Sequence, residues 1–107
     1  MNDIQHVEAA RNFAQRIINE GGSESADRVR WAWRTVTARA ADDDEIRITL
    51  ETLALHQKRY SSDLESARQL ITYGESVPDR NSDPAELAAW TMIANLLLNC
   101  DEVVNKN

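Results

Sequence analysis

The side chains best spaced to act together on a ligand lie in the most apolar segment of the chain. Asn95 and Asn99 stand four residues apart, which puts both on one face of a helix, and Asp101 follows closely. Because buried polar groups need partners, one interpretation is that they bond across the fold to arginines such as Arg28 or Arg34 and fix the helix register. The other is a polar groove for a ligand or a partner peptide, or part of an enzyme site that upstream domains complete. We favour the first interpretation, and the second stays open.

A second candidate is the basic and aromatic stretch RVRWAWR at residues 28–34. As a strand it would place Trp31 and Trp33 on one face, with arginines opposite, in a ribbon that could grip nucleic acid. As a helix it places Trp33 in the apolar stripe and turns Trp31 roughly 200° away, since each residue turns a helix by about 100°. We favour the helix. Trp31 then either packs against a second neighbouring helix or stands exposed beside Arg30 and Arg34, as a surface suited to binding another protein.

The densest acidic run is Asp42-Asp43-Asp44-Glu45. Four acidic residues together could bind a cation. They could equally accept hydrogen bonds from the first amides of a helix and face the positive end of its dipole. The spacing of Asp42 and Glu45 is that of a capping box, so we favour capping.

Metal and nucleophile motifs are incomplete. Asp79, Asn81 and Asp83 have the spacing of a calcium loop, but Pro84 stands where that loop needs glycine and Trp90 where it needs glutamate. His6 and His56 belong to separate helical segments and are expected on the surface, and Cys100, the only cysteine, is expected to be an inert apolar residue. We therefore expect no catalytic, metal or cofactor site in this chain.

The charge of the chain limits its partners. The 107 residues carry 18 acidic and 12 basic side chains, a net charge of −6, which repels phosphate backbones and anionic lipids. No segment approaches the apolar length of a membrane span, and the first residues do not have the pattern of an export signal. We expect neither nucleic-acid binding nor membrane insertion.

The positioning elements are helices. Apolar residues recur at intervals of three and four residues, as in a helix, over residues 3–20, 25–40, 42–60, 62–74 and 83–104. We expect these segments to form one domain spanning 1–107. Predicted ends and starts are Gly21-Gly22, Ser25, Asp42 with Glu45, Ser62 with Glu65, Gly74, and Asp83-Pro84 with Glu86 as its capping glutamate. Residues 75–82 read as a loop. Because the last segment is apolar nearly all round, we predict an all-α five-helix bundle with the hydrophobic C-terminal helix at its centre.

Two stretches resemble a known family. DPAELAAWTMIANLLLNCDE at 83–102 is similar to the closing signature of the planctomycete-specific domain one family, and FAQRIINEGG with DRVRWAWR resembles its upstream pattern. The resemblance is to the C-terminal part of that domain and covers nearly the whole chain. It departs at Ala40-Ala41-Asp42, in place of a glycine-arginine-proline type turn, and at Cys100, where an aliphatic residue is expected.

The family is a domain of unknown function in large planctomycete proteins that often also carry cytochrome-c-like modules, so the resemblance assigns no reaction. It implies an exported or cell-envelope protein of which this chain is a C-terminal piece. We thus expect a non-catalytic module that docks onto upstream domains of its parent protein or onto an envelope protein. A free-standing small adaptor, which needs an exposed apolar patch at Trp31 or Trp90, stays open. The candidate interaction residues are Arg30, Trp31, Arg34, Asn95, Asn99 and Asp101.

Overall fold

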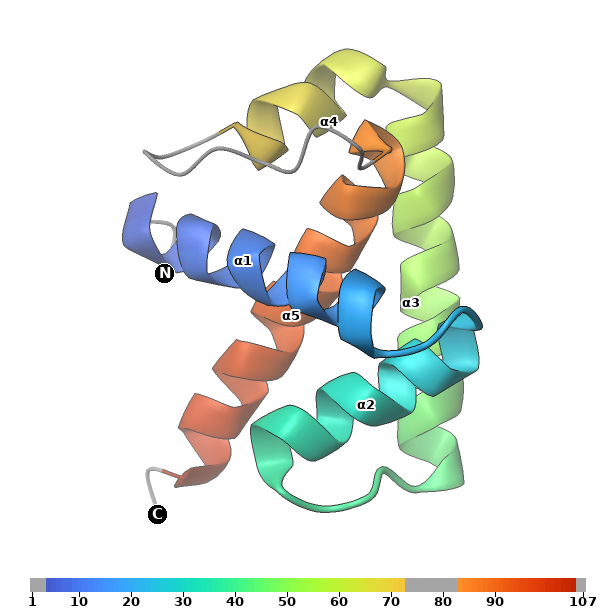
Figure 1. Ribbon diagram of the computed structural model, residues 1–107, viewed down its shortest axis with the longest axis vertical. Helices are drawn as coiled ribbons and strands as arrows, with labels where there is room; N and C mark the ends of the chain where they lie inside the picture. The colour runs from blue at the N-terminus through green and yellow to red at the C-terminus, as the bar shows by residue number, and fades with distance from the viewer. Residues whose placement is uncertain (1–3, 73–82, 106–107) are drawn as a thin grey trace.

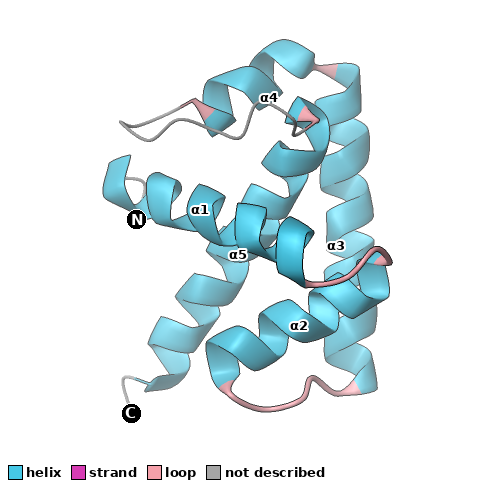
Figure 2. Ribbon diagram, in the orientation of Figure 1, coloured by secondary structure: helices cyan, strands magenta, loops and turns pink. Residues whose placement is uncertain are grey.

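Five α-helices follow one another in the computed structural model, which describes the backbone of residues 4–72 and 83–105 and the side chains of residues 7–72 and 83–100. They are α1 (Ile4–Glu20), α2 (Ser25–Thr37), α3 (Asp43–Ser62), α4 (Leu64–Ile71) and α5 (Pro84–Asn105). The described residues contain no strand (Figures 1 and 2). The all-α prediction is confirmed.

The apolar helix α5 runs through the middle of the fold, and each of the other helices packs against it (Figure 1). Helix α1 crosses it, α3 lies along one side, α4 packs near its start, and α2 lies at the opposite end from α4. Six residues of its first half are 0% exposed: Leu87, Ala88, Ala89, Trp90, Ile93 and Ala94. The prediction of a central C-terminal helix is confirmed, and its cause is a sequence without a polar face.

Helix α1 ends at two glycines that the backbone needs for different reasons. A Cβ atom on Gly21 would lie 2.6 Å from the carbonyl oxygen of Ile17, closer than Cβ atoms come. Gly22 has a φ of 102°, a region in which an L side chain is strained. The predicted end of the first helix is confirmed, and the tight turn lets α2 begin at Ser25.

The start of α3 is the capping box that the sequence predicts. The Asp42 side chain accepts a hydrogen bond from the Glu45 amide at 2.7 Å, and the Glu45 side chain accepts from the Asp42 amide at 2.9 Å. Helix α2, by contrast, ends at Thr37 rather than at residue 40, because Ala38 takes a left-handed conformation with φ 60°.

Other predicted starts are wrong in detail. Glu24, not Ser25, is the N-cap of α2, and its side chain makes no capping bond. Asp63, not Ser62, caps α4, through a bond from the Ser66 amide at 3.2 Å. Gly74, the loop 75–82 and the calcium-like Asp79 and Asn81 lie outside the described residues.

At the start of α5, Asp83 accepts from the Ala85 amide at 3.1 Å, as a cap should. Glu86 does not act as the predicted capping glutamate. Its carboxylate accepts from Gln57 on α3 at 3.1 Å and from Nε1 of Trp90 at 3.0 Å, so it ties α5 to α3 and satisfies the buried indole.

Candidate functional site

Helix α2 lies between α1 and α3, and its two tryptophans turn to different neighbours. Trp31 is half-buried against α1, with its ring 6.1 Å from that of Phe13 and the Arg16 guanidinium 5.4 Å from its centroid. Of the two predicted positions for Trp31, packing against a second helix is therefore the one observed. The Trp31 side chain is part of the contact between α2 and α1 and does not form a free aromatic surface.

Trp33 turns to the other side. Its Nε1 donates to Oγ1 of Thr49 on α3 at 3.1 Å, and the Arg39 guanidinium lies 5.6 Å from its ring centroid. The indole is half-buried, whereas Thr49 is buried. This hydrogen bond joins α2 to α3.

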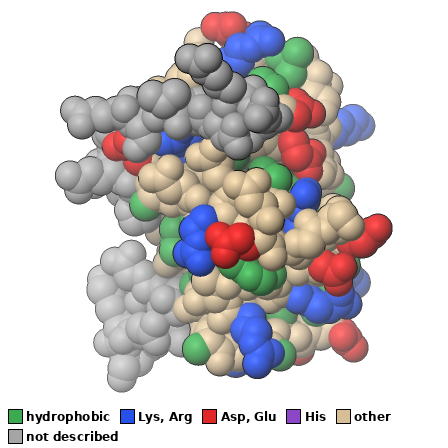
Figure 3. Space-filling view, in the orientation of Figure 1, with side chains coloured by type: hydrophobic (Ala, Val, Ile, Leu, Met, Phe, Trp, Pro, Cys, Tyr) green, Lys and Arg blue, Asp and Glu red, His purple; other side chains and the backbone are tan. Residues whose placement is uncertain are grey.

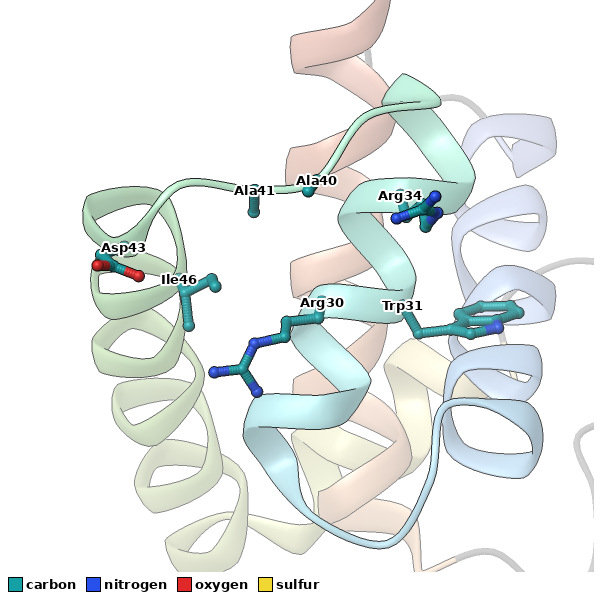
Figure 4. A pocket seen from close by; sticks show the side chains of 7 residues that line it. All are labelled: Arg30, Trp31, Arg34, Ala40, Ala41, Asp43 and Ile46. Carbon is teal, nitrogen blue, oxygen red and sulfur yellow. The ribbon is translucent and has the colours of Figure 1, made fainter.

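Beside this contact a groove remains open between α2 and α3, with a volume of about 310 Å³. We name it the α2–α3 groove. Figure 4 shows it with Arg30 reaching from α2 toward α3, the Trp31 ring turned away toward α1, and two alanines on the connecting segment. Its lining residues are Arg30, Trp31, Arg34, Ala40, Ala41, Asp43 and Ile46.

The groove combines an apolar floor with cationic walls. Ile46 is buried and Ala41 half-buried, while Arg30 and Arg34 are exposed. The guanidinium of Arg34 makes no hydrogen bond or ion pair with any residue that the structure describes, and Arg30 makes one long contact, 3.4 Å to Asp27. Three of the six predicted interaction residues thus meet in one groove.

The segment that connects α2 to α3 and borders the groove is held in place by an ion pair. Arg39 donates to both carboxylate oxygens of Glu45, at 2.9 and 2.7 Å. These bonds, together with the Asp42 amide, lower the pKa of Glu45 to about 2. Asp42 and Glu45 are therefore occupied in capping, which supports the interpretation that we favoured for the acidic run.

Acidic and basic side chains intermingle around the groove. The face on which α1 and α2 lie carries groups of both signs scattered over it (Figure 3). Asp43 itself lines the groove at the start of α3. A ligand would meet two guanidinium groups in an otherwise mixed surface, which favours a small number of directed contacts over broad electrostatic attraction.

The remaining candidates belong to α5 and are not among the residues that line the groove. Asn95 and Asn99 are half-buried on its second half, and the side chain of Asp101 lies outside the described residues. Arg28, named as a possible partner, donates to the carbonyl oxygens of Gly22 at 2.8 Å and Ile18 at 3.3 Å, across the α1–α2 turn.

Several other side chains differ from expectation. Cys100, which we expect to be an inert apolar residue, is exposed on α5. His56 is half-buried and stacked on Tyr60, and burial together with Arg59 lowers its pKa. Trp90 is fully buried, so no adaptor surface exists at that residue.

Arg11 is a buried polar residue that the sequence interpretation missed. It is 0% exposed, and its Nε and Nη1 have no hydrogen-bond partner in the described chain. Burial lowers its pKa, while the charge of Glu8 acts in the opposite direction. The signal was present in the sequence, since Arg11 falls in the helical stripe of Val7, Ala14 and Ile18.

Comparison of the chain with family models, curated proteins and solved structures gives no match. Among the described residues, no helix combines the length and apolar character needed to cross a membrane. No cluster of three potential metal-binding side chains occurs among them either.

Proposed function

We propose that this chain is a non-catalytic helical docking module, and that the α2–α3 groove holds an extended, carboxylate-bearing segment of a partner protein. The observation that carries the proposal is the unpaired guanidinium of Arg34, which lines the groove together with Arg30 and with the apolar residues Ile46 and Ala41. A carboxylate accepts paired hydrogen bonds from a guanidinium, and a small apolar side chain next to it would cover the floor.

The size of the groove agrees with a short segment. Its volume of about 310 Å³ is at the low end of the range for ligand pockets, too small for an element of folded structure. The ion pair of Arg39 with Glu45 holds the connecting segment in place before a ligand arrives, so little ordering cost falls on binding.

The family resemblance supports a partner inside the same protein. Under this proposal the chain is the C-terminal module of a large planctomycete protein, and its groove takes an acidic segment of the upstream domains. An envelope protein is the alternative partner. An immunoblot of fractionated native cells tests the setting: a band far above 12.1 kDa in the envelope or exported fraction supports it, and a band near 12.1 kDa in the cytosol contradicts it.

An NMR titration tests the groove. The probe is a short synthetic peptide in which glutamate alternates with alanine, and the control peptide carries glutamine in place of glutamate. We expect only the acidic peptide to shift the amides of Ala41 and Ile46 and the Nε–H signals of Arg30 and Arg34. Shifts that fall on other helices, or that the glutamine peptide reproduces, would contradict the proposal.

A matched pair of variants makes the test sharper. Arg34→Gln should weaken the acidic peptide by about tenfold or more, because a charge-assisted bond is lost. Arg68→Gln removes an exposed arginine from α4, outside the groove lining, and should leave the affinity unchanged. Equal losses in the two variants would mean that only overall charge matters.

A further inference from the structure

The side of α3 opposite the core carries two large aliphatic side chains that face outward. Ile48 is 52% exposed and Leu55 is 70% exposed, although both are residues that usually lie inside. They are seven residues apart, which places them on one stripe of the helix, and α3 forms an outer edge of the fold (Figure 1). The core residue Leu53 lies on the opposite side of the same helix.

Charged residues flank this stripe with opposite signs. Asp44 precedes it and Lys58 and Arg59 follow it, and all three side chains are exposed. The face of α3 therefore carries Asp44 toward its start, 3.6 Å from Arg47 of the same helix, and Lys58 and Arg59 toward its end. Such a face matches a helix that runs in the opposite direction with the same pattern.

The pattern is symmetric about the point between Glu51 and Thr52. Ile48 and Leu55 lie equally far from it, about 5 Å along the axis, and Asp44 and Arg59 also lie equally far, about 11 Å, at 1.5 Å per residue. A second α3 laid antiparallel would place Ile48 opposite Leu55 of the second copy. The same register would place Asp44 opposite Arg59 of the second copy.

We propose that the outward face of α3 pairs antiparallel with α3 of a second copy of this chain. A two-fold axis through the centre forms both Ile48–Leu55 contacts and both Asp44–Arg59 contacts at once. A parallel pair would bring Asp44 against Asp44 and Arg59 against Arg59. At the centre, Glu51 meets its own copy, and Arg47, 3.5 Å away on the same helix, offsets that repulsion.

The contact is small, since its apolar part consists of two side chains from each copy. It falls below the area of a standard stable interface, so the pairing is reversible and depends on concentration. The residues it uses are not among those that line the α2–α3 groove.

Sedimentation velocity tests the proposal on the full chain, from about 10 µM to about 1 mM, a range that covers weak association. We expect the sedimentation coefficient to rise toward that of a dimer. Leu55→Asp should keep the chain monomeric, whereas Leu64→Asp, at an exposed leucine of α4, should not. A monomer throughout the range, or equal effects of the two variants, would overturn the proposal.

A charge exchange identifies the partner as a second copy. In a pair of Asp44→Arg chains, the new arginine would meet Arg59 of the other copy. In a pair of Arg59→Asp chains, the new aspartate would meet Asp44. Both contacts join like charges, so each variant should remain monomeric by itself. Mixed together, they form two complementary contacts and should dimerise. Circular dichroism first confirms that each variant is folded, and Asp44→Asn with Arg59→Gln serves as a milder pair expected to weaken dimerisation when tested singly. Failure of the mixed variants to associate, or association of either alone, would overturn the proposal.

Discussion

The contact of α1 with α5 and that of α2 with α3 are built from different side chains. Helices α1 and α5 make the most extensive contact in the fold, and both bury small residues, among them Ala10, Ala14, Ala88 and Ala89, which let helices approach closely. Between α2 and α3 the contact depends on the Trp33–Thr49 hydrogen bond and the Arg39–Glu45 ion pair, and an open groove remains beside them. We infer from this difference that the α1–α5 contact contributes more to the free energy of unfolding, whereas the α2–α3 contact leaves the space for a ligand.

Replacing the buried tryptophan of α5 and the half-buried Trp31 of α2 should give the largest difference. Trp90→Ala empties a fully buried site and removes a donor from Glu86, so we expect a loss of about 3 to 5 kcal/mol in the free energy of unfolding. Trp31→Ala removes a half-buried ring and should cost about 1 to 2 kcal/mol. Urea denaturation monitored by circular dichroism measures both values. Equal losses would contradict the division between a tightly packed α5 and a more loosely packed α2.

Enlarging an alanine in each region is the second test. Ala14→Leu forces extra volume between packed helices and should cost about 1 to 3 kcal/mol. Ala41→Leu extends into the α2–α3 groove and should change the unfolding free energy by less than about 0.5 kcal/mol. It should also block the acidic peptide. A large destabilisation by Ala41→Leu would show that the groove is already filled.

What the sequence predicts well is local or strongly patterned. The capping box of Asp42 and Glu45 involves residues three apart, so its signal does not depend on the rest of the fold. The central position of α5 follows from an apolar character that no single neighbour can cover. Both predictions are confirmed.

What the sequence does not determine depends on contacts between distant residues. Whether Glu86 caps its own helix or accepts from Gln57 on α3 is decided by how two helices meet. The neighbour of Trp31 and the burial of Arg11 are of the same kind. The groove itself arises because α2 stops at Thr37 and leaves a connecting segment of small residues, an end that the helical periodicity did not mark.

A smaller effect should come from the hydrogen bond that joins α2 and α3. Trp33→Phe keeps most of the ring and removes the donor to Thr49, so we expect a loss of about 1 kcal/mol. Because Thr49 also donates to the carbonyl of Glu45, Thr49→Val alone should cost more than the shared bond. A double-mutant cycle isolates the coupling, expected at about 1 kcal/mol. No coupling would mean that the α2–α3 contact is held by packing alone.

The smallest effect concerns the ion pair that closes the groove, and pH reveals it. The hydrogen bond from Arg39 and that from the Asp42 amide lower the pKa of Glu45 to about 2, from an ordinary value of 4.5. Since the folded state holds the proton less tightly than the unfolded chain, this stabilisation is complete above pH 4.5 and is lost as the pH falls toward 2. Glu45→Gln should therefore cost less than about 1 kcal/mol at neutral pH and make the unfolding free energy fall less steeply over that window.

The matched control is Glu51→Gln, which removes an exposed carboxylate from the same helix but outside the capping box. It should keep the slope of the unmodified chain between pH 4.5 and 2, the interval set by Glu45. If both variants flatten the curve equally, the acid sensitivity reflects the total charge of α3. If only Glu45→Gln flattens the pH dependence of the unfolding free energy, the acid sensitivity arises at the segment that connects α2 to α3. In that case Glu45→Gln should also lower the affinity of the groove for the acidic peptide at neutral pH, where the peptide keeps its charge, because the ion pair with Arg39 is absent.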